Sequence, residues 1–196
     1  MAADFASLVS LACHDLRTPL ATVSGFAKTL LRLERLDEEK AARYLHLIDA
    51  GSTELAELLE LLSVAARIES GRYDPVTREI DSLELARAAV PDATGMGVPV
   101  QVDVEAVRRS LASLALAAHR HGGVEVGVNV AGANVQIEPV TESAGPIVLA
   151  EELKDLGSAV AVRVVRALGG EVGLEGERLV VTLPSASATG ATGAGP

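Results

Sequence analysis

The side chains best suited to chemistry lie near the N-terminus: His14, Asp15 and Thr18. A carboxylate next to a histidine can accept a hydrogen bond from one ring nitrogen, which fixes the tautomer and leaves the other nitrogen as a nucleophile. Thr18 follows His14 by four residues, a spacing that places both side chains on the same face of a helix. Its hydroxyl can position water or an incoming phosphoryl oxygen. Together these residues indicate group transfer at the imidazole.

The sequence around His14 predicts a long amphipathic helix over residues 9–33. With Val9 at heptad position a, His14 falls at position f and faces away from the apolar seam, so we expect an exposed imidazole. Pro19 cannot donate a backbone hydrogen bond to Asp15, which predicts a kink beside the candidate nucleophile. The seam has alternating gaps of three and four residues: Val9, Ala12, Leu16, Pro19, Val23, Phe26, Leu30 and Leu33.

An exposed stripe of mostly small side chains continues from His14. Four residues follow on it at increments of 4, 3, 4 and 3: Thr18, Ala21, Gly25 and Lys28. Small side chains leave room for another protein to approach closely. The predicted docking residues are Arg17, Ala21, Gly25 and Lys28. The alternative is that the small residues only fill the surface.

A second helix is predicted between Asp37, as its N-cap, and Gly71, as its end. Residues 1–71 would then form a helical hairpin. Both helices have apolar faces too broad to cover each other, so the simplest solution is a homodimer in which two hairpins form a four-helix bundle. The alternative is that the hairpin packs against the C-terminal part of its own chain.

From residue 72 onward, short β-branched runs alternate with amphipathic helices, which predicts an α/β domain over residues 72–184 and an α+β fold class overall. We expect strands at residues 76–80, 98–102, 124–130, 135–140, 171–174 and 179–183, and helices at 82–90, 104–121 and 156–168. Antiparallel pairs are expected around Gly132 and Gly176. Residues 185–196 lack periodicity and are predicted to be disordered.

Composition narrows the classes of partner. The 196 residues include 17 Lys and Arg against 27 Asp and Glu, for a net charge of −10, and aromatic side chains make up only 2%. A negative protein without stacking platforms is a poor ligand for nucleic acids and anionic membranes, so we expect neither as a partner. The single cysteine, Cys13, excludes an internal disulfide, and no apolar run approaches the roughly 18 residues of a membrane span. The expected location is the cytoplasm.

The string HDLRTPL at residues 14–20 resembles the phosphoacceptor box in the dimerisation and histidine-phosphotransfer region of two-component sensor histidine kinases. Residues 67–72, RIESGR, are similar to the end of that region's second helix, and the resemblance continues more weakly to Pro184. It implies that His14 carries a phosphoryl group and that Asp15 assists its transfer. It also implies that Asp15 and Thr18 act together when the family dephosphorylates its response regulator.

The α/β domain resembles the family's ATP-binding domain in the order of its elements, but its nucleotide motifs are altered. Ala117 replaces the asparagine that holds magnesium, and a methyl group cannot ligate a hard cation. Of the second glycine motif only Gly157 remains, because Leu153 and Asp155 fill the other glycine positions, and Asp155 would oppose triphosphate charge. The segment 147–157 is short for the family's lid. Three positions depart from the Asp-x-Gly-x-Gly motif: Glu142, Ala144 and Pro146.

These changes predict a degenerate ATP-binding domain, and the expected function is that of a dimeric histidine phosphotransferase. His14 would accept a phosphoryl group from the aspartate of one receiver domain and pass it to another, without ATP. No cofactor is expected in this chain, because a receiver brings its own aspartate and bound magnesium.

Four other functions remain open. The chain can be a phosphatase or sequestering partner of one response regulator, or an ATP-dependent sensor histidine kinase. It can also be a nonenzymatic dimerisation module with a vestigial histidine. A metal site at His119 and His121, with His46 or His14, rests only on a His-x-His pair, so we expect no metal.

Overall fold

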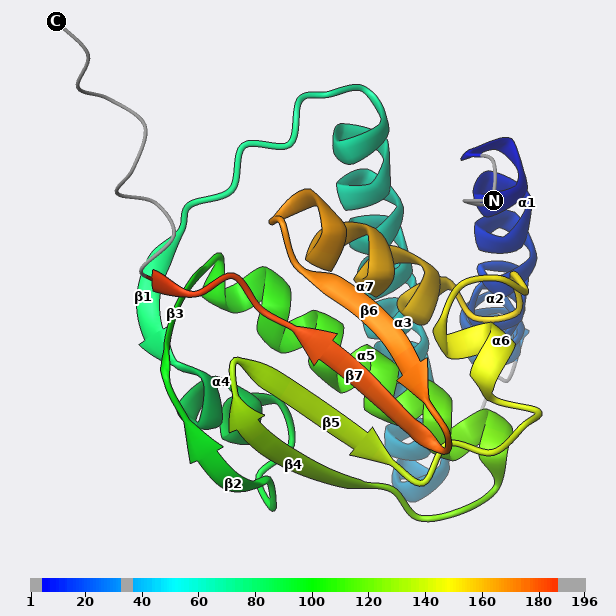
Figure 1. Cartoon of the computed structure of the whole chain (residues 1–196). Coiled ribbons are helices and arrows are strands. Elements are labelled where there is room, and N and C mark those ends of the chain that lie inside the picture. The colour runs from blue at the N-terminus through cyan, green and yellow to red at the C-terminus, as the bar shows by residue number, and fades with distance from the viewer. Residues whose placement is uncertain (1–4, 33–36, 187–196) are drawn as a thin grey trace, which may run out of the picture.

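The N-terminal part of the chain is an antiparallel helical hairpin, as predicted (Figure 1). The computed structural model describes residues 5–32 and 37–186, so the expected seam residue Leu33 and the turn near Leu36 lie outside the described residues. The first arm consists of α1 (Phe5–Asp15) and α2 (Arg17–Arg32). The second arm is α3 (Glu38–Glu69).

The ends of α3 agree with the prediction. The Asp37 carboxylate caps the helix by accepting a hydrogen bond from the Glu39 amide at 2.9 Å. Ser70 is the C-cap, and Gly71 follows in the left-handed region at φ +66°. A glycine adopts this conformation without steric cost, so it ends the helix.

The first arm is interrupted at Leu16. Because Pro19 has no N–H, the carbonyl oxygen of Asp15 loses its helical partner. The backbone is still connected across the break, since the Leu16 amide donates to the Ala12 carbonyl at 2.9 Å. The predicted kink is therefore a break between two helices.

The rest of the chain contains a two-stranded and a five-stranded sheet with four helices in the described residues. The strand order of the larger sheet is β2-β4-β5-β7-β6, in which only β2 and β4 pair in parallel. The smaller sheet is the antiparallel pair β1-β3. The elements in chain order are β1 (Arg78–Asp81), α4 (Ser82–Ala89), β2 (Thr94–Gly97), β3 (Pro99–Val102), α5 (Val104–Gly122), β4 (Gly127–Gly132), β5 (Asn134–Glu138), α6 (Gly145–Val148), α7 (Leu156–Ala167), β6 (Glu171–Glu175) and β7 (Arg178–Thr182).

All six predicted strands and three predicted helices of this part are present, with ends shifted by a few residues. The antiparallel pairs β4-β5 and β6-β7 turn at Gly132 and Gly176, as predicted. The sequence does not predict β2 or α6. Two of the four residues of β2 are glycine, and α6 is a single turn with a proline at its start, so neither has a periodic apolar pattern.

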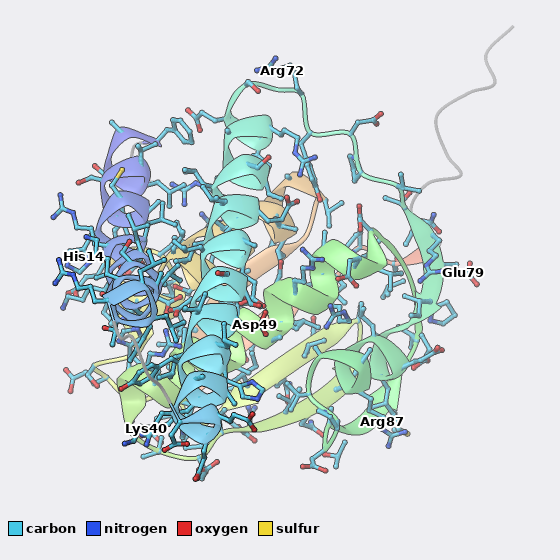
Figure 2. All side chains as sticks on the ribbon, turned by 180° about the vertical axis from the view of Figure 1, so that it is seen from behind. His14, Lys40, Asp49, Arg72, Glu79 and Arg87 are labelled. Atoms are coloured by element: carbon cyan, nitrogen blue, oxygen red, sulfur yellow. The ribbon has the colours of Figure 1, made fainter. Side chains whose placement is uncertain are left out.

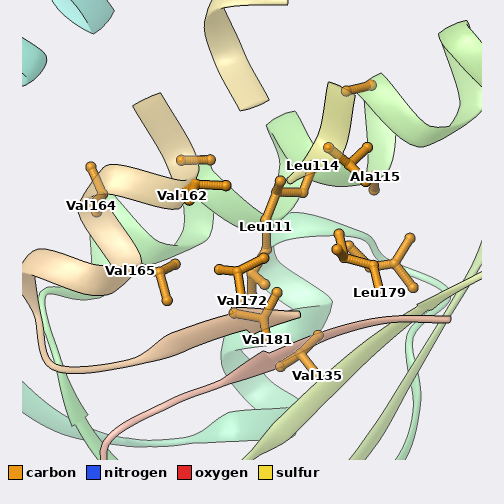
Figure 3. Close-up of a cluster of buried hydrophobic side chains, with 14 of the residues drawn as sticks. Leu111, Leu114, Ala115, Val135, Val162, Val164, Val165, Val172, Leu179 and Val181 are labelled. Atoms are coloured by element: carbon orange, nitrogen blue, oxygen red, sulfur yellow. The ribbon is translucent and has the colours of Figure 1, made fainter. Parts of the chain in front are cut away.

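Helices α5 and α7 pack on one face of the larger sheet (Figures 1 and 3). In Figure 3, valines of α7 and leucines of α5 meet Val135, Val172 and Val181 of the strands. The largest fully buried side chains are all Leu, Ile or Val. The core is thus built from the aliphatic residues that dominate the composition.

The hairpin also packs against α7, so it shares one core with the sheet domain. Leu8 and Ala12 of α1 and Ala65 of α3 are buried in the same cluster as the valines of α7. This is the alternative packing that the sequence leaves open. It does not cover the whole hairpin, because four leucines stay between 54% and 86% exposed: Leu20, Leu31, Leu45 and Leu59.

The last strand is followed by a short paired segment. The Gln101 amide donates to the Pro184 carbonyl at 3.1 Å, and Ser185 forms a bridge with Val100. The prediction of disorder from residue 185 onward is therefore wrong at Ser185, which is paired. The rest of the predicted tail, residues 187–196, lies outside the described residues. Within the described ranges, no helix is long and apolar enough to cross a membrane.

Candidate functional site

His14 lies in the last turn of α1, and its side chain is 78% exposed. Leu8 and Ala12, on the other side of α1, have no exposed surface. Residues two positions apart on a helix point in directions that differ by roughly 200°. The burial of Ala12 therefore directs the side chain of His14 outward. Figure 2 shows His14 on the outer side of α1. The prediction of an exposed imidazole is confirmed.

The imidazole is oriented by its neighbour. Nδ1 of His14 lies 3.1 Å from Oδ1 of Asp15, and a carboxylate only accepts hydrogen bonds, so Nδ1 is the donor. In the neutral ring Nε2 then carries the free lone pair. The Asp15 side chain is 29% exposed, which strengthens its attraction for a positive ring relative to a fully solvated pair. The pair can hold a nucleophilic nitrogen in one tautomer and balance positive charge on the ring.

Thr18 and the predicted docking residues lie on α2, beyond the helix break. Thr18 is exposed in the first turn of α2, and its carbonyl accepts a hydrogen bond from the Thr22 hydroxyl at 3.1 Å. A Cβ placed on Gly25 would meet no atom within 4 Å, so nothing in this chain requires glycine there. The other three docking residues are exposed as well: Arg17, Ala21 and Lys28. The stripe is thus present, and its role in docking stays a prediction.

Comparison with known proteins identifies the hairpin. Residues 6–71 match the family model described as "His Kinase A (phospho-acceptor) domain". The probable sensor histidine kinase TcrY of Mycobacterium tuberculosis is 36% identical over 86 residues, which are 43% of this chain and 18% of TcrY. Residues 6–71 are therefore similar to the phosphoacceptor domain of two-component histidine kinases. It spans only about a fifth of the length of this curated relative.

Histidine kinases also share the fold. The histidine kinase AdeS of Acinetobacter baumannii superposes with a TM-score of 0.61 at 18% identity, over 88% of this chain and 98% of that one. Full-length ShkA, solved in complex with AMPPNP, gives a TM-score of 0.50 at 19% identity, over 94% of this chain and 47% of ShkA. These likenesses extend the family's fold from the hairpin into the sheet domain.

The prediction of a histidine phosphotransferase that works without ATP is wrong. The hairpin matches a phosphoacceptor domain, the sheet domain attached to it has a fold found in histidine kinases, and the similar proteins are histidine kinases. The findings favour the ATP-dependent histidine kinase that the sequence leaves as an alternative. The prediction was wrong because it gave the altered nucleotide motifs more weight than the order of the domains.

The altered nucleotide positions lie on and around α5, α6 and α7. Ala117 is fully buried in α5, and Ala144 is fully buried just before α6. Glu142 is exposed in the loop between β5 and α6. Gly157 lies in the first turn of α7, where a Cβ would meet Cβ of Ser113 at 3.2 Å. The two helices are therefore in contact at this point.

Asp155 is the N-cap of α7, and its carboxylate is held from two sides. Oδ1 accepts a hydrogen bond from the Ser158 amide at 2.8 Å. Oδ2 lies 3.5 Å from Nη1 of Arg120 and 3.5 Å from Nε2 of His121, both in the last turn of α5. Sequence reasoning missed Arg120 and His121 as partners of this carboxylate. The sequence does contain a signal for this contact. The last turn of α5 is basic, and the apolar helix α7 begins with an acidic cap, so the two ends attract each other.

These residues do not fit a magnesium ion. The position of the expected amide ligand holds the Ala117 methyl, and the described residues contain no group of three or more His, Cys, Asp or Glu side chains that could hold a metal. The alternative site at the histidine pair gains no support either. Nδ1 of His119 bonds to the Val124 carbonyl at 2.9 Å, whereas His121 faces Asp155.

Proposed function

We propose that this chain contains the phosphoacceptor and kinase-type domains of an ATP-dependent histidine kinase, and that His14 is the residue phosphorylated. The observation that supports this most is the exposed imidazole whose Nδ1 donates to Asp15. Nε2 is thereby left as the nucleophile at the surface of a phosphoacceptor domain.

The proposed step balances as follows. The Nε2 lone pair attacks the γ-phosphorus of ATP, the N–P bond forms, and the P–O bond to the β-phosphate breaks, so that ADP leaves. The proton stays on Nδ1, and the Asp15 carboxylate at 3.1 Å offsets the positive charge that grows on the ring. A receiver aspartate then attacks the same phosphorus, and the N–P bond breaks.

Labelling with γ-³²P-ATP tests this function. We expect wild-type protein to acquire label that is stable in alkali and lost in acid, as a phosphorus–nitrogen bond requires. His14→Gln should abolish the label, whereas His46→Gln, at an exposed histidine of α3, should keep it. Label that persists in the His14→Gln protein, or no label in the wild type at millimolar ATP, would overturn the proposal.

We further propose that receivers dock on the stripe of α2 and that Thr18 acts in dephosphorylating them. Its exposed hydroxyl lies on the next turn from Asp15 and can orient water toward an aspartyl phosphate. Thr18→Ala should slow receiver dephosphorylation and leave labelling of His14 intact. Thr53→Ala, at an exposed threonine of α3, serves as the matched control. Equal loss of both activities in Thr18→Ala would contradict this assignment.

We also propose that the hairpin forms a homodimer through its exposed leucines. Phosphoacceptor domains of this family generally dimerise, and Leu45 and Leu59 of α3 are 57% and 55% exposed. Glutamate at both positions should convert dimer to monomer in sedimentation measurements, because charged side chains do not bury at a helix seam. Leu116→Glu, at a 52% exposed leucine of α5, should leave the dimer intact. A wild type that sediments as a monomer would refute the dimer.

A further inference from the structure

A cavity of about 390 Å³ lies where the helical hairpin meets the sheet domain. Its wall comes from the C-terminal part of α3, the segment that follows α3, and the first turns of α5. Figure 2 shows Arg72, one of the lining residues, at the turn where α3 ends. The volume is in the range of small-molecule sites, roughly 300–1,000 Å³. None of the altered nucleotide positions lines this cavity.

Tyr73 lines the cavity, and its phenol hydroxyl is buried without a hydrogen-bond partner among the described residues. An unpaired buried hydroxyl costs free energy, and native proteins contain few of them. Burial raises the pKa of Tyr73, the Asp103 carboxylate raises it further, and Arg67 lowers it. The hydroxyl therefore stays protonated at neutral pH, and its oxygen can accept hydrogen bonds from a bound molecule.

Asp103 offers a second acceptor to the same cavity. One oxygen, Oδ1, caps α5 by accepting a hydrogen bond from the Ala106 amide at 3.1 Å. Its other oxygen has no hydrogen bond or ion pair within the described ranges. The carboxylate is near enough to act on the Tyr73 hydroxyl electrostatically, yet the two groups form no hydrogen bond. A primary ammonium group carries three N–H donors and can bond to both.

The charges of the lining favour a cation. Carboxylates outnumber guanidinium groups by four to three. Two of the guanidinium groups are already paired: Arg67 lies 3.2 Å from a carboxylate oxygen of Glu60. Arg109 lies 2.6 Å from a carboxylate oxygen of Glu105. The negative remainder attracts a positive ligand, and Val64 of α3 provides an apolar surface for its carbon chain.

We propose that this cavity binds a small organic molecule through a primary ammonium group, which donates hydrogen bonds to the Tyr73 hydroxyl oxygen and to the Asp103 carboxylate. The lining residues belong to the hairpin, to the segment after it and to the sheet domain. A bound ammonium compound therefore stabilises the contact between the two parts of the chain. The site goes beyond the proposed function, because binding requires neither ATP nor His14.

The test is an NMR titration of the purified full chain with n-butylamine, which is protonated at neutral pH. The uncharged probe 1-butanol has the same carbon chain and serves as the matched compound. We expect butylamine to shift the amide signals of the segment after α3 and of the first turns of α5, and butanol to leave them unchanged. The concentration dependence of these shifts gives the dissociation constant.

Three variants locate the ammonium group. Asp103→Asn keeps a capping oxygen but removes the charge, and it should weaken butylamine binding by roughly tenfold or more. Tyr73→Phe should weaken binding as well, while the free protein stays at least as stable in urea, because no unpaired hydroxyl remains. Asp81→Asn changes the corresponding cap of α4, outside the cavity, and should bind like the wild type. Circular dichroism verifies the fold of each variant.

Equal affinity of Asp103→Asn and wild-type protein would overturn the proposal, as would a loss of the same size in Asp81→Asn. Equal shifts with butanol and butylamine would also overturn it, because the cavity would then select for the carbon chain alone. The same holds if a large excess of butylamine causes no shift in the wild type. Labelling of wild-type and His14→Gln protein with ATP judges the proposed function separately.

Discussion

The Asp15 carboxylate lies 3.1 Å from Nδ1 of His14, although the two residues are consecutive. On a regular helix, consecutive side chains diverge by about 100°. The contact is made in the last turn of α1, immediately before the break that Pro19 imposes on the helix. The proline thus ends α1 at the residue that orients the nucleophile.

Asp15→Asn should slow phosphorylation of His14 by roughly 100-fold or more, within the range for groups that assist proton and charge transfer. Asparagine can still accept the Nδ1 hydrogen bond, so the lost quantity is the negative charge that stabilises the ring during transfer. The initial rate of labelling measures this effect. Asp49→Asn changes an exposed carboxylate of α3 (Figure 2) and should leave the rate unchanged. Equal rates in Asp15→Asn and wild type would show that the pair is structural only.

Gly51 and Gly25 should respond oppositely to alanine. A Cβ on Gly51 would lie 2.9 Å from Cγ2 of Val23 and 3.3 Å from the Pro19 carbonyl oxygen, so α2 and α3 must separate slightly. The expected loss in unfolding free energy is about 1–3 kcal/mol, as for other overpacked sites. Gly25 faces open space, and alanine there should add up to about 1 kcal/mol through helix propensity.

Urea unfolding followed by circular dichroism distinguishes the two variants. If the stripe on α2 docks receivers, Gly25→Ala should also lower receiver affinity while stabilising the chain. A stabilised variant with unchanged affinity would mean that Gly25 only fills the surface.

The sequence predicts those features of the structure that depend on the periodicity of apolar residues and on local helix caps. The helix ends at Asp37 and Gly71 and the exposure of His14 follow from local rules, because caps and heptad positions are set by neighbouring residues. The packing of Leu8 and Ala12 on α7 does not follow, because an apolar helix face does not specify its partner. A local pattern can predict that a surface is buried, but not which element covers it.

The candidate site shows the same limit. Asp155 can be recognised in the sequence as a charge in a glycine motif, but its contacts with Arg120 and His121 span more than 30 residues. Only the packing of α5 against α7 brings these groups together. The prediction of a function without ATP is wrong for another reason, because it gave single motif positions more weight than the order of the domains.

Glu105 provides a test at acid pH. Its carboxylate accepts hydrogen bonds from Arg108 and Arg109, which lower the pKa of Glu105 from 4.5 to about 2. A lowered folded-state pKa means that the stabilisation is complete above the unfolded value and disappears as the pH falls through about 2. Because the side chain is 55% exposed, the contribution should stay below about 1 kcal/mol. NMR titration of the carboxyl carbon measures the midpoint. A midpoint at 4.5 would show that the arginine pair is absent in solution.

Leu8→Ala tests whether the sheet domain is held against the hairpin. Leu8 has no exposed surface and belongs to the cluster that joins α1 to α7, on the opposite side of α1 from His14. Truncation should lower the unfolding free energy by about 2–5 kcal/mol, because it removes buried surface and leaves a cavity. Leu31→Ala, at an 86% exposed leucine of α2, should change it by less than about 0.5 kcal/mol. Hydrogen exchange should rise in α7 of the Leu8→Ala protein if the two parts share one core. Unchanged protection of α7 would mean that the sheet domain folds without this contact to the hairpin.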